Sequence, residues 1–297
     1  MTQHAPVSPF PRLSTTVARP AHGSTAGGSS AAGSSAPDAS GSGSGTGSAP
    51  SRGILLAHGA TGSIADNFTG LIPVLTASGH TVVAPDYPGS GETPRAEEPL
   101  TLDALADAIV AEAVEAGVET FTLLGFSVGT AVSVRAAVRH PERVRGLVLT
   151  AGFVRPDARA RLWSELWLRL LANEDYAGLA RARAIAAWGP RYLDAMSPEQ
   201  REAVLDPRPE LLQPGTAEQT ALIAEVDAVD DLPRVSVPTL VISTSQDGLI
   251  HPDGSRYLAD HIPGAEYAEL ETGHLPMAER PEEWHELIET FLAKHGL

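Results

Sequence analysis

The chain has 297 residues, no cysteine, and 37 acidic against 21 basic residues, which gives a formal charge of −16 at pH 7. The lack of cysteine excludes disulfides, a thiol nucleophile and thiolate-bound metals. Because the negative charge repels phosphate backbones and anionic lipids, we expect neither nucleic acid nor a membrane as a partner. The sequence contains no apolar run of about 18 residues and no apolar core typical of a secretory signal, so we expect a cytoplasmic protein.

The first fifty residues differ in composition from the rest. In residues 21–50, all but two residues are Ala, Gly, Ser, Thr or Pro. Such a segment has almost no side chain to bury and cannot offset the entropy cost of ordering its backbone. We therefore predict a disordered low-complexity tail over residues 1–50. Within it, "LSTTVARP" (13–20) is the one stretch that could supply an edge strand.

Residues 51–297 are enough for one α/β domain with a sizeable core. Short β-branched apolar runs alternate with longer stretches of helical period, a pattern typical of a mostly parallel sheet with helices on both faces. The expected strands are residues 53–58, 81–86, 120–125, 145–151, 239–244 and 265–270. The expected helices around them lie within residues 63–79, 101–118, 127–144 and 281–295.

Residues 154–232 interrupt this alternation, because the stretch has helical period throughout and contains no strand pattern. An insertion between the fourth and fifth expected strands would lie at the carboxyl ends of the strands, where sheets of this type bind ligands. We therefore predict a helical cap over residues 154–232 on a core formed by residues 51–153 and 233–297.

The stretch "LLGFSVGTAV" (123–132) places Ser127 between Gly125 and Gly129, after an expected strand and before an expected helix. This spacing fits a nucleophile elbow, a strained strand-to-helix turn that lifts the serine above the sheet. The N-terminus of the following helix would suit an anionic intermediate. The alternative is that Ser127 is an ordinary helix-capping serine.

A serine hydroxyl is a poor nucleophile until a base takes its proton and a carboxylate orients that base. Asp247 follows the fifth expected strand and His274 follows the sixth. The order serine, aspartate, histidine is the one found in α/β-hydrolases. Asp157, after the fourth expected strand, is a competing acid, whereas we expect Asp253 to cap the next helix.

With these motifs, residues 51–297 resemble the α/β-hydrolase superfamily, in particular its cap-bearing esterases, lactonases and cofactor-free perhydrolases. "LLAHGATGS" resembles the family's oxyanion loop, and "APDYPGSGET" resembles the run after the family's next strand. The resemblance implies that the backbone N–H groups of Ala60 and Val128 hold the developing oxyanion, and we expect His58 to support that loop. The family usually begins with a β-hairpin, so here either residues 13–20 supply a reduced strand or the sheet starts at residue 53.

The family resemblance also implies a reaction. Dehalogenases and epoxide hydrolases of the family carry an aspartate where this chain has Ser127, so acyl transfer is favoured over both chemistries. We expect a serine hydrolase that cleaves a small-molecule ester, lactone or thioester through an acyl-enzyme, with no cofactor and no metal. The alternatives are an acyltransferase, a cofactor-free perhydrolase, and a non-catalytic ligand-binding homologue. The sequence leaves the substrate and the oligomeric state open.

Aromatic residues of the expected cap are candidates for substrate binding. Trp163 and Trp167 are four residues apart and share one helical face, and Trp188 follows in the next segment. We favour simple packing of these rings on the body. The alternative is that they line an apolar acyl pocket together with Phe126.

Overall fold

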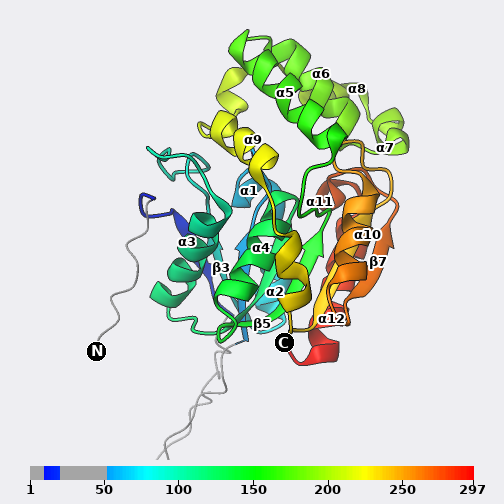
Figure 1. Ribbon diagram of the computed structural model, residues 1–297. Helices are drawn as coiled ribbons and strands as arrows, with labels where there is room; N and C mark the ends of the chain where they lie inside the picture. Colours follow the sequence, from blue (N-terminus) through cyan, green and yellow to red (C-terminus); the bar gives the residue numbers. More distant parts are fainter. Residues whose placement is uncertain (1–9, 21–51) are drawn as a thin grey trace, which may run out of the picture.

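A computed structural model describes residues 10–20 and 52–297 (Figure 1). Within them the chain forms one seven-stranded sheet in the order β1-β3-β2-β4-β5-β6-β7, in which β1 is antiparallel to β3 and all other pairs are parallel. The strands are β1 (Thr15–Ala18), β2 (Arg52–Ala57), β3 (His80–Pro85), β4 (Phe121–Phe126), β5 (Val144–Thr150), β6 (Thr239–Thr244) and β7 (Glu266–Leu270). The predicted fold class is therefore confirmed, and β2 to β7 each begin and end within one residue of an expected strand.

The predicted tail over residues 1–50 is wrong for the segment that contains β1. Thr15 lies opposite Pro85 and Ala18 opposite Val82, so the stretch 13–20 supplies the reduced edge strand. The backbone N–H groups and carbonyls of this stretch pair with β3. The composition of the stretch did not predict this pairing. The rest of the predicted tail, residues 1–9 and 21–50, lies outside the described residues.

Side chains alternate between the two faces of the sheet, and each face has its own apolar core. Leu55 of β2 points into one core, whereas its neighbours Ile54 and Leu56 point into the other. The first core is covered by α3 (Leu102–Glu115), α4 (Val128–Arg139) and α10 (Pro252–His261). The second core is covered by α1 (Ile64–Phe68), α2 (Leu71–Ala77), α11 (Pro276–Glu279) and α12 (Pro281–His295) (Figure 1).

The helix expected within residues 63–79 is two helices, because α1 ends at Phe68 and α2 begins at Leu71. Pro73 explains the break. In one continuous helix its ring would collide with the carbonyl of Thr69, and that carbonyl would have no N–H to bond. The chain turns at Gly70, and Pro73 falls within the first turn of α2, where proline is tolerated.

The inserted segment forms a helical cap at one end of the sheet (Figure 1). Its helices are α5 (Ala158–Ala172), α6 (Tyr176–Ala187), α7 (Pro190–Ala195), α8 (Pro198–Val204), the 3₁₀ turn η1 (Pro209–Leu211) and α9 (Thr216–Glu225). The chain rejoins the body earlier than the predicted boundary at residue 232. Val226, Ala228 and Leu232, around the 3₁₀ turn η2 (Val229–Arg234), belong to the first core.

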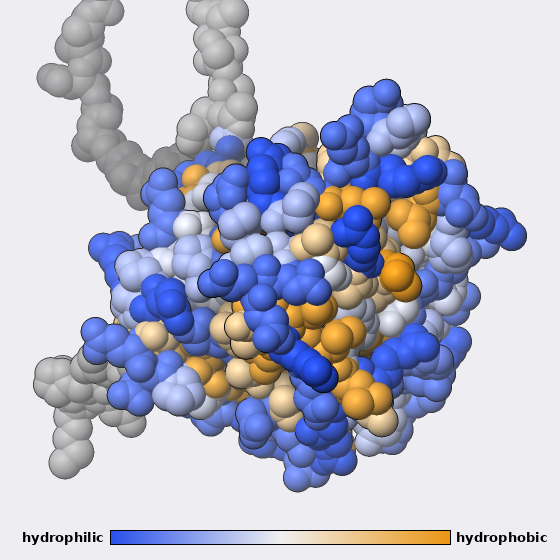
Figure 2. Space-filling model, turned by 90° about the horizontal axis from the view of Figure 1, so that it is seen from above, coloured by the Kyte–Doolittle hydropathy of each residue, from blue (hydrophilic) through white to orange (hydrophobic). Residues whose placement is uncertain are grey.

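Figure 2 looks down on the cap and shows an apolar area within a polar surround. Four large apolar side chains of the cap are exposed: Leu162, Leu166, Ile185 and Leu211. Among the described residues no helix is long and apolar enough to cross a membrane.

Candidate active site

Ser127 sits in the strained turn between β4 and α4, with φ 54° and ψ −122°. Positive φ is costly for a residue with a side chain, and such strain persists only where the surroundings enforce it. The flanking glycines show how tight the turn is. A Cβ atom on Gly125 would lie 2.5 Å from the Gly129 carbonyl oxygen, and one on Gly129 would lie 2.0 Å from that of Ala57. Both positions therefore require glycine, and the elbow geometry predicted from the spacing is confirmed.

The alternative role of Ser127 as a helix cap is wrong. Its side chain makes no capping hydrogen bond to the first turn of α4, although the residue occupies the N-cap position. Instead Ser127 lines a cavity between the body and the cap and is 7% exposed there. The hydroxyl therefore faces ligand space at the start of a helix, where the helix dipole favours negative charge.

His274 and Asp247 meet as the sequence predicts. The Nδ1 atom of His274 lies 2.7 Å from Asp247 Oδ2, and both residues are at most 4% exposed. Because a carboxylate only accepts hydrogen bonds, Nδ1 carries the proton and Nε2 keeps a free lone pair. Asp247 is itself held by the N–H groups of Leu249 and Ile250 and by the hydroxyl of Thr244. His274 lines the same cavity as Ser127, with its ring 4.9 Å from that of Phe126.

The competing carboxylates have structural partners. Asp157 is the N-cap of α5, where its Oδ1 accepts from the N–H of Ala160 at 2.7 Å. Asp253 does not cap α10 as expected. The N-cap is His251, whose Nδ1 accepts from the N–H of Asp253, because Pro252 at the first helical position shifts the helix start by two residues.

The predicted oxyanion loop runs directly beside the elbow. A Cβ atom on Gly59 would lie 2.9 Å from the Phe126 ring and 3.3 Å from Ser127 Cβ, so the backbone of the loop touches the serine. Ala60 lines the cavity. In the described part of the chain, the N–H groups of Ala60 and Val128 donate no hydrogen bond to another protein group. Two free N–H donors beside a serine are what an oxyanion hole needs.

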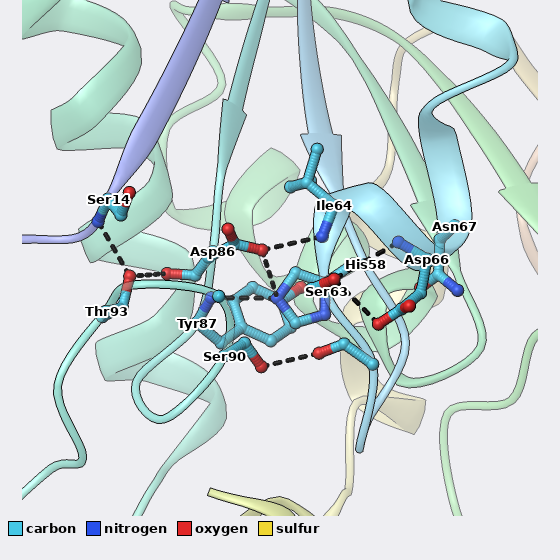
Figure 3. Close-up of polar contacts among 12 residues, drawn as sticks. Ser14, His58, Ser63, Ile64, Asp66, Asn67, Asp86, Tyr87, Ser90 and Thr93 are labelled. Carbon is cyan, nitrogen blue, oxygen red and sulfur yellow. Dashed lines mark hydrogen bonds and ion pairs between the residues drawn. The ribbon is translucent and has the colours of Figure 1, made fainter. Parts of the chain in front are cut away.

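Buried His58 anchors this loop to the neighbouring one (Figure 3). Its Nε2 accepts from the N–H of Tyr87 at 2.9 Å, so Nδ1 carries the proton that it donates to the carbonyl of Gly59 at 2.8 Å. Burial lowers the pKa of His58 to about 4, which keeps the ring neutral. The carboxylate of Asp86 accepts from the N–H of Ile64, and the Ser90 hydroxyl donates to Gly62, closing the network.

Two amide side chains that sequence reasoning missed hold the loop from other directions. Asn67 of α1 accepts the N–H of Gly59 at 2.9 Å. Gln219 of α9, 1% exposed, accepts the N–H of Thr61 at 2.7 Å and donates to Pro88 and Ser90. Thr61 is a β-branched residue at φ 64°, and the bond from Gln219 helps to hold that strained conformation.

The cap also binds the loops that carry the acid and the base. The carbonyls at the end of α6 accept from these loops, Ala186 from the N–H of Gly248 and Ala187 from the N–H of His274. Glu279 of α11 accepts from the N–H groups of Gly189 and Gly273, and burial raises the pKa of this carboxyl. The cap is therefore part of the site and not only a cover. Nothing in the local sequence around these residues signals the contacts.

The cavity has a volume of about 330 Å³. The four predicted substrate-binding residues, Phe126, Trp163, Trp167 and Trp188, all line it. The alternative interpretation, that the tryptophans line a pocket, therefore has the geometry it needs, and their contact with substrate stays a prediction. Among the described residues no three histidine, aspartate or glutamate side chains gather as metal ligands would.

The sheet order, the elbow and the facing Asp247–His274 pair define a class of hydrolase, and comparison with known proteins gives the same class. Residues 54–281 match the family model for the alpha/beta hydrolase fold, so the chain belongs to that family. The solved structure of MGS-M2, an alpha/beta hydrolase enzyme from a deep-sea metagenome library, superposes with a TM-score of 0.74 at 18% identity, covering 84% of this chain and 92% of that one.

Two relatives have names that state a reaction. The chain is 35% identical to pyrrolizixenacetamide deacetylase of Xenorhabdus hominickii over 81% of its own length and 90% of the relative's. It is 30% identical to pimeloyl-[acyl-carrier protein] methyl ester esterase of Neisseria meningitidis over 80% of its own length and 93% of the relative's. Both relatives are hydrolases, which supports ester hydrolysis as the chemistry of this chain.

Proposed function

We propose that the chain is a serine hydrolase that cleaves the ester, lactone or thioester of a small molecule through an acyl-enzyme. The observation that carries the proposal is that Ser127, on a strained elbow, shares one cavity with His274, whose Nδ1 bonds Asp247 at 2.7 Å. A nucleophile, a base and an orienting acid in this arrangement are the parts that acyl transfer needs.

In the acylation step, Nε2 of His274 takes the proton of the Ser127 hydroxyl as Oγ forms a bond to the carbonyl carbon. The carbonyl π-electrons move to oxygen, and the N–H groups of Ala60 and Val128 bind the resulting oxyanion. When the carbonyl re-forms, the bond to the leaving oxygen or sulfur breaks, and the leaving group takes the proton from Nε2. The negative charge of Asp247 stabilises the imidazolium between these two transfers.

In the deacylation step, a water molecule takes the place of the leaving group. Nε2 removes one of its protons while the water oxygen attacks the acyl carbon, and the second tetrahedral intermediate uses the same two N–H donors. Collapse releases the acid and returns the proton to Ser127 Oγ. An alcohol, an amine or hydrogen peroxide in place of water would give acyl transfer or perhydrolysis with the same residues. Access of water to the acyl-enzyme separates these outcomes.

A second candidate function is the hydrolysis of an N-acetyl amide. The name of the deacetylase that is 35% identical to this chain favours it. An amine is a poorer leaving group than an alcohol, so cleavage of an amide depends more strongly on proton transfer from His274 to the departing nitrogen. Matched acetate esters and acetanilides, assayed side by side, distinguish the two functions by which member of each pair turns over.

Labelling with a fluorophosphonate tests the proposed nucleophile. We expect a single adduct that peptide mass spectrometry places on Ser127, and no adduct in Ser127→Ala. Ser164→Ala is the matched control, because Ser164 lines the same cavity but donates to the carbonyl of Ala160 within its own helix. Labelling elsewhere in folded protein, or labelling that persists in Ser127→Ala, contradicts the proposal.

A further inference from the structure

One cationic side chain in the cavity has no hydrogen-bond or ion-pair partner among the described residues. Arg183 of α6 is half-buried and lines the same cavity as Ser127 and His274. Among the described residues, none accepts a hydrogen bond from its guanidinium and no carboxylate forms an ion pair with it. Burial lowers the pKa of Arg183, with only the charge of Asp66 opposing that effect. The guanidinium stays charged, so it sits in the wall of a ligand cavity with unused donors.

Other buried or half-buried arginines of the chain have carboxylate partners. Arg135 contacts Asp103 and Asp231, and Arg143 contacts Glu119 and Glu142. Partial burial of a guanidinium costs free energy that such partners offset. Arg183 lacks this compensation within the described part of the chain, which is the arrangement expected when a ligand supplies the acceptor.

Asp66 does not serve as that acceptor. It is exposed at the wall of the cavity, and its Oδ2 already accepts from Ser63 Oγ at 2.8 Å and from Gln213 Nε2 at 3.2 Å. No ion pair joins it to Arg183, although both residues line the cavity. Both residues line the cavity, so a ligand group bound there would lie near both charges.

We propose that Arg183 binds a carboxylate of the substrate, so that the enzyme acts on acyl compounds that carry a free carboxyl group away from the bond to be cleaved. This inference rests on the proposed function. A guanidinium pairs with a carboxylate through two parallel hydrogen bonds, so one arginine is enough to bind one singly charged carboxylate. A phosphate dianion would need further donors, but Arg183 is the only lysine or arginine among the described lining residues, and nearby Asp66 would repel a second charge.

The recognition must be short-ranged. The chain carries a formal charge of −16, so its overall field repels an anionic substrate rather than attracting it. Apolar side chains, among them Trp163, Leu249 and Ile250, make up much of the remaining wall. They would contact the carbon chain between the carboxylate and the scissile carbonyl.

Paired substrates test the proposal. Monomethyl esters of straight-chain dicarboxylic acids are compared with dimethyl esters of the same acids, and acetate esters of hydroxy acids are compared with those of the matching alcohols. The first set places the carboxylate on the acyl side and the second on the alcohol side. We expect the wild type to prefer the carboxylate member of at least one set. In Arg183→Met the ratio of kcat/KM between the two members falls about 10- to 100-fold through KM, as loss of a charge-assisted pair predicts.

Arg181→Met is the matched control. Arg181 is exposed two residues away on the same helix, and among the described residues its guanidinium donates only to the carbonyl of Ala177. We expect its ratio to equal that of the wild type. An equal ratio in wild type and Arg183→Met, or a wild type with no preference for the carboxylate, overturns the inference.

A binding measurement separates this inference from the proposed function. Calorimetry compares Ser127→Ala with the double variant Ser127→Ala/Arg183→Met. We expect the double variant to bind a dicarboxylate product about 10-fold or more weakly. If no ester is hydrolysed but this loss is seen, the proposed function fails and the carboxylate site stands. If esters are hydrolysed and Arg183→Met leaves dicarboxylate binding unchanged, the carboxylate site fails and the hydrolase stands.

Discussion

The buried imidazole of His58 makes the fold sensitive to acid. Its folded pKa of about 4 lies below the ordinary 6.5, so the unfolded chain takes up the proton first as pH falls. Stability is therefore full above pH 6.5 and is lost as pH falls towards 4, by about 3 kcal/mol in total at 1.36 kcal/mol per pKa unit.

Denaturant unfolding between pH 7 and pH 4 measures this loss. We expect the free energy of unfolding of the wild type to fall by about 2 to 3 kcal/mol more than that of His58→Gln over this range. The variant is less stable at pH 7 because its hydrogen bonds to Gly59 and Tyr87 are disturbed, but it lacks the titrating ring. Burial raises the pKa values of Asp86 and Glu279, which opposes the loss in both proteins. Parallel stability curves would contradict the assignment.

The acid of the proposed triad is Asp247, and the pair of variants Asp247→Asn and Asp157→Asn tests this assignment. The asparagine at position 247 would offer an N–H to His274 Nδ1 and favour the wrong tautomer, which costs about 10⁴-fold in kcat in the worked serine-protease case. Asn at position 157 keeps an oxygen that can cap α5, so we expect less than about a fivefold loss. Steady-state kinetics with one ester, and circular dichroism for the fold, provide the comparison. A greater loss in Asp157→Asn would reverse the assignment.

The site residues that could be predicted from the sequence are those with a recognisable local pattern. Ser127 stands between two glycines that a strand-to-helix turn requires, and Asp247 and His274 each follow a strand. Gln219, by contrast, bonds Thr61 across 158 residues of sequence, and a glutamine in a helix has no pattern that predicts a distant acceptor. Arg183 was missed for the same reason, because an unpaired arginine is recognised only when its surroundings are known.

Strand β1 and the residues before it stabilise the edge of the sheet, although the composition of this segment did not indicate it. Phe10 and Leu13, just before it, are 7% and 4% exposed in the first core. The backbone of Ser14 bonds Asp86 and Thr93, which belong to the loop that His58 contacts. Deletion of residues 1–20 should therefore lower the free energy of unfolding by at least about 3 kcal/mol, since each buried large side chain contributes about 1.5 to 3 kcal/mol.

Deletion of residues 23–46 is the control for this truncation. It leaves enough chain to span the two strand spacings of about 4.8 Å each between β1 and β2. Shortening a connection of this kind changes loop entropy by less than about 1 kcal/mol, so we expect the melting temperature to stay nearly unchanged. Equal effects of the two deletions on thermal unfolding would show that β1 contributes little.

The other strands were predictable because buried parallel strands are short, continuous apolar runs. The helix expected within residues 63–79 was not, because its apolar spacing continues across the break that Pro73 imposes. Periodicity indicates which residues face the core. It does not report whether the backbone between them stays helical.

For the molecule as a whole, the position of the cap followed from where the insertion falls in the strand order. Its contacts with the body did not. The end of α6 accepts hydrogen bonds from the loops of Asp247 and His274, and α9 bonds the loop of Ala60. These contacts use backbone carbonyls and one amide, which carry no compositional signal. The prediction of a cap was therefore sound in outline, while its part in holding the site came only from the structure.

The hydrogen bond between Gln219 and Thr61 couples the position of the cap to the conformation of the loop that carries Ala60. Any lifting of α9 from the body to widen the cavity would withdraw the acceptor that steadies Thr61, one residue from the N–H of Ala60. An open cap would then leave Thr61 without this acceptor, while His58 and Asn67 would still hold Gly59, and closure would restore the bond. A bound substrate would thus meet the fully held loop only when the cap is closed.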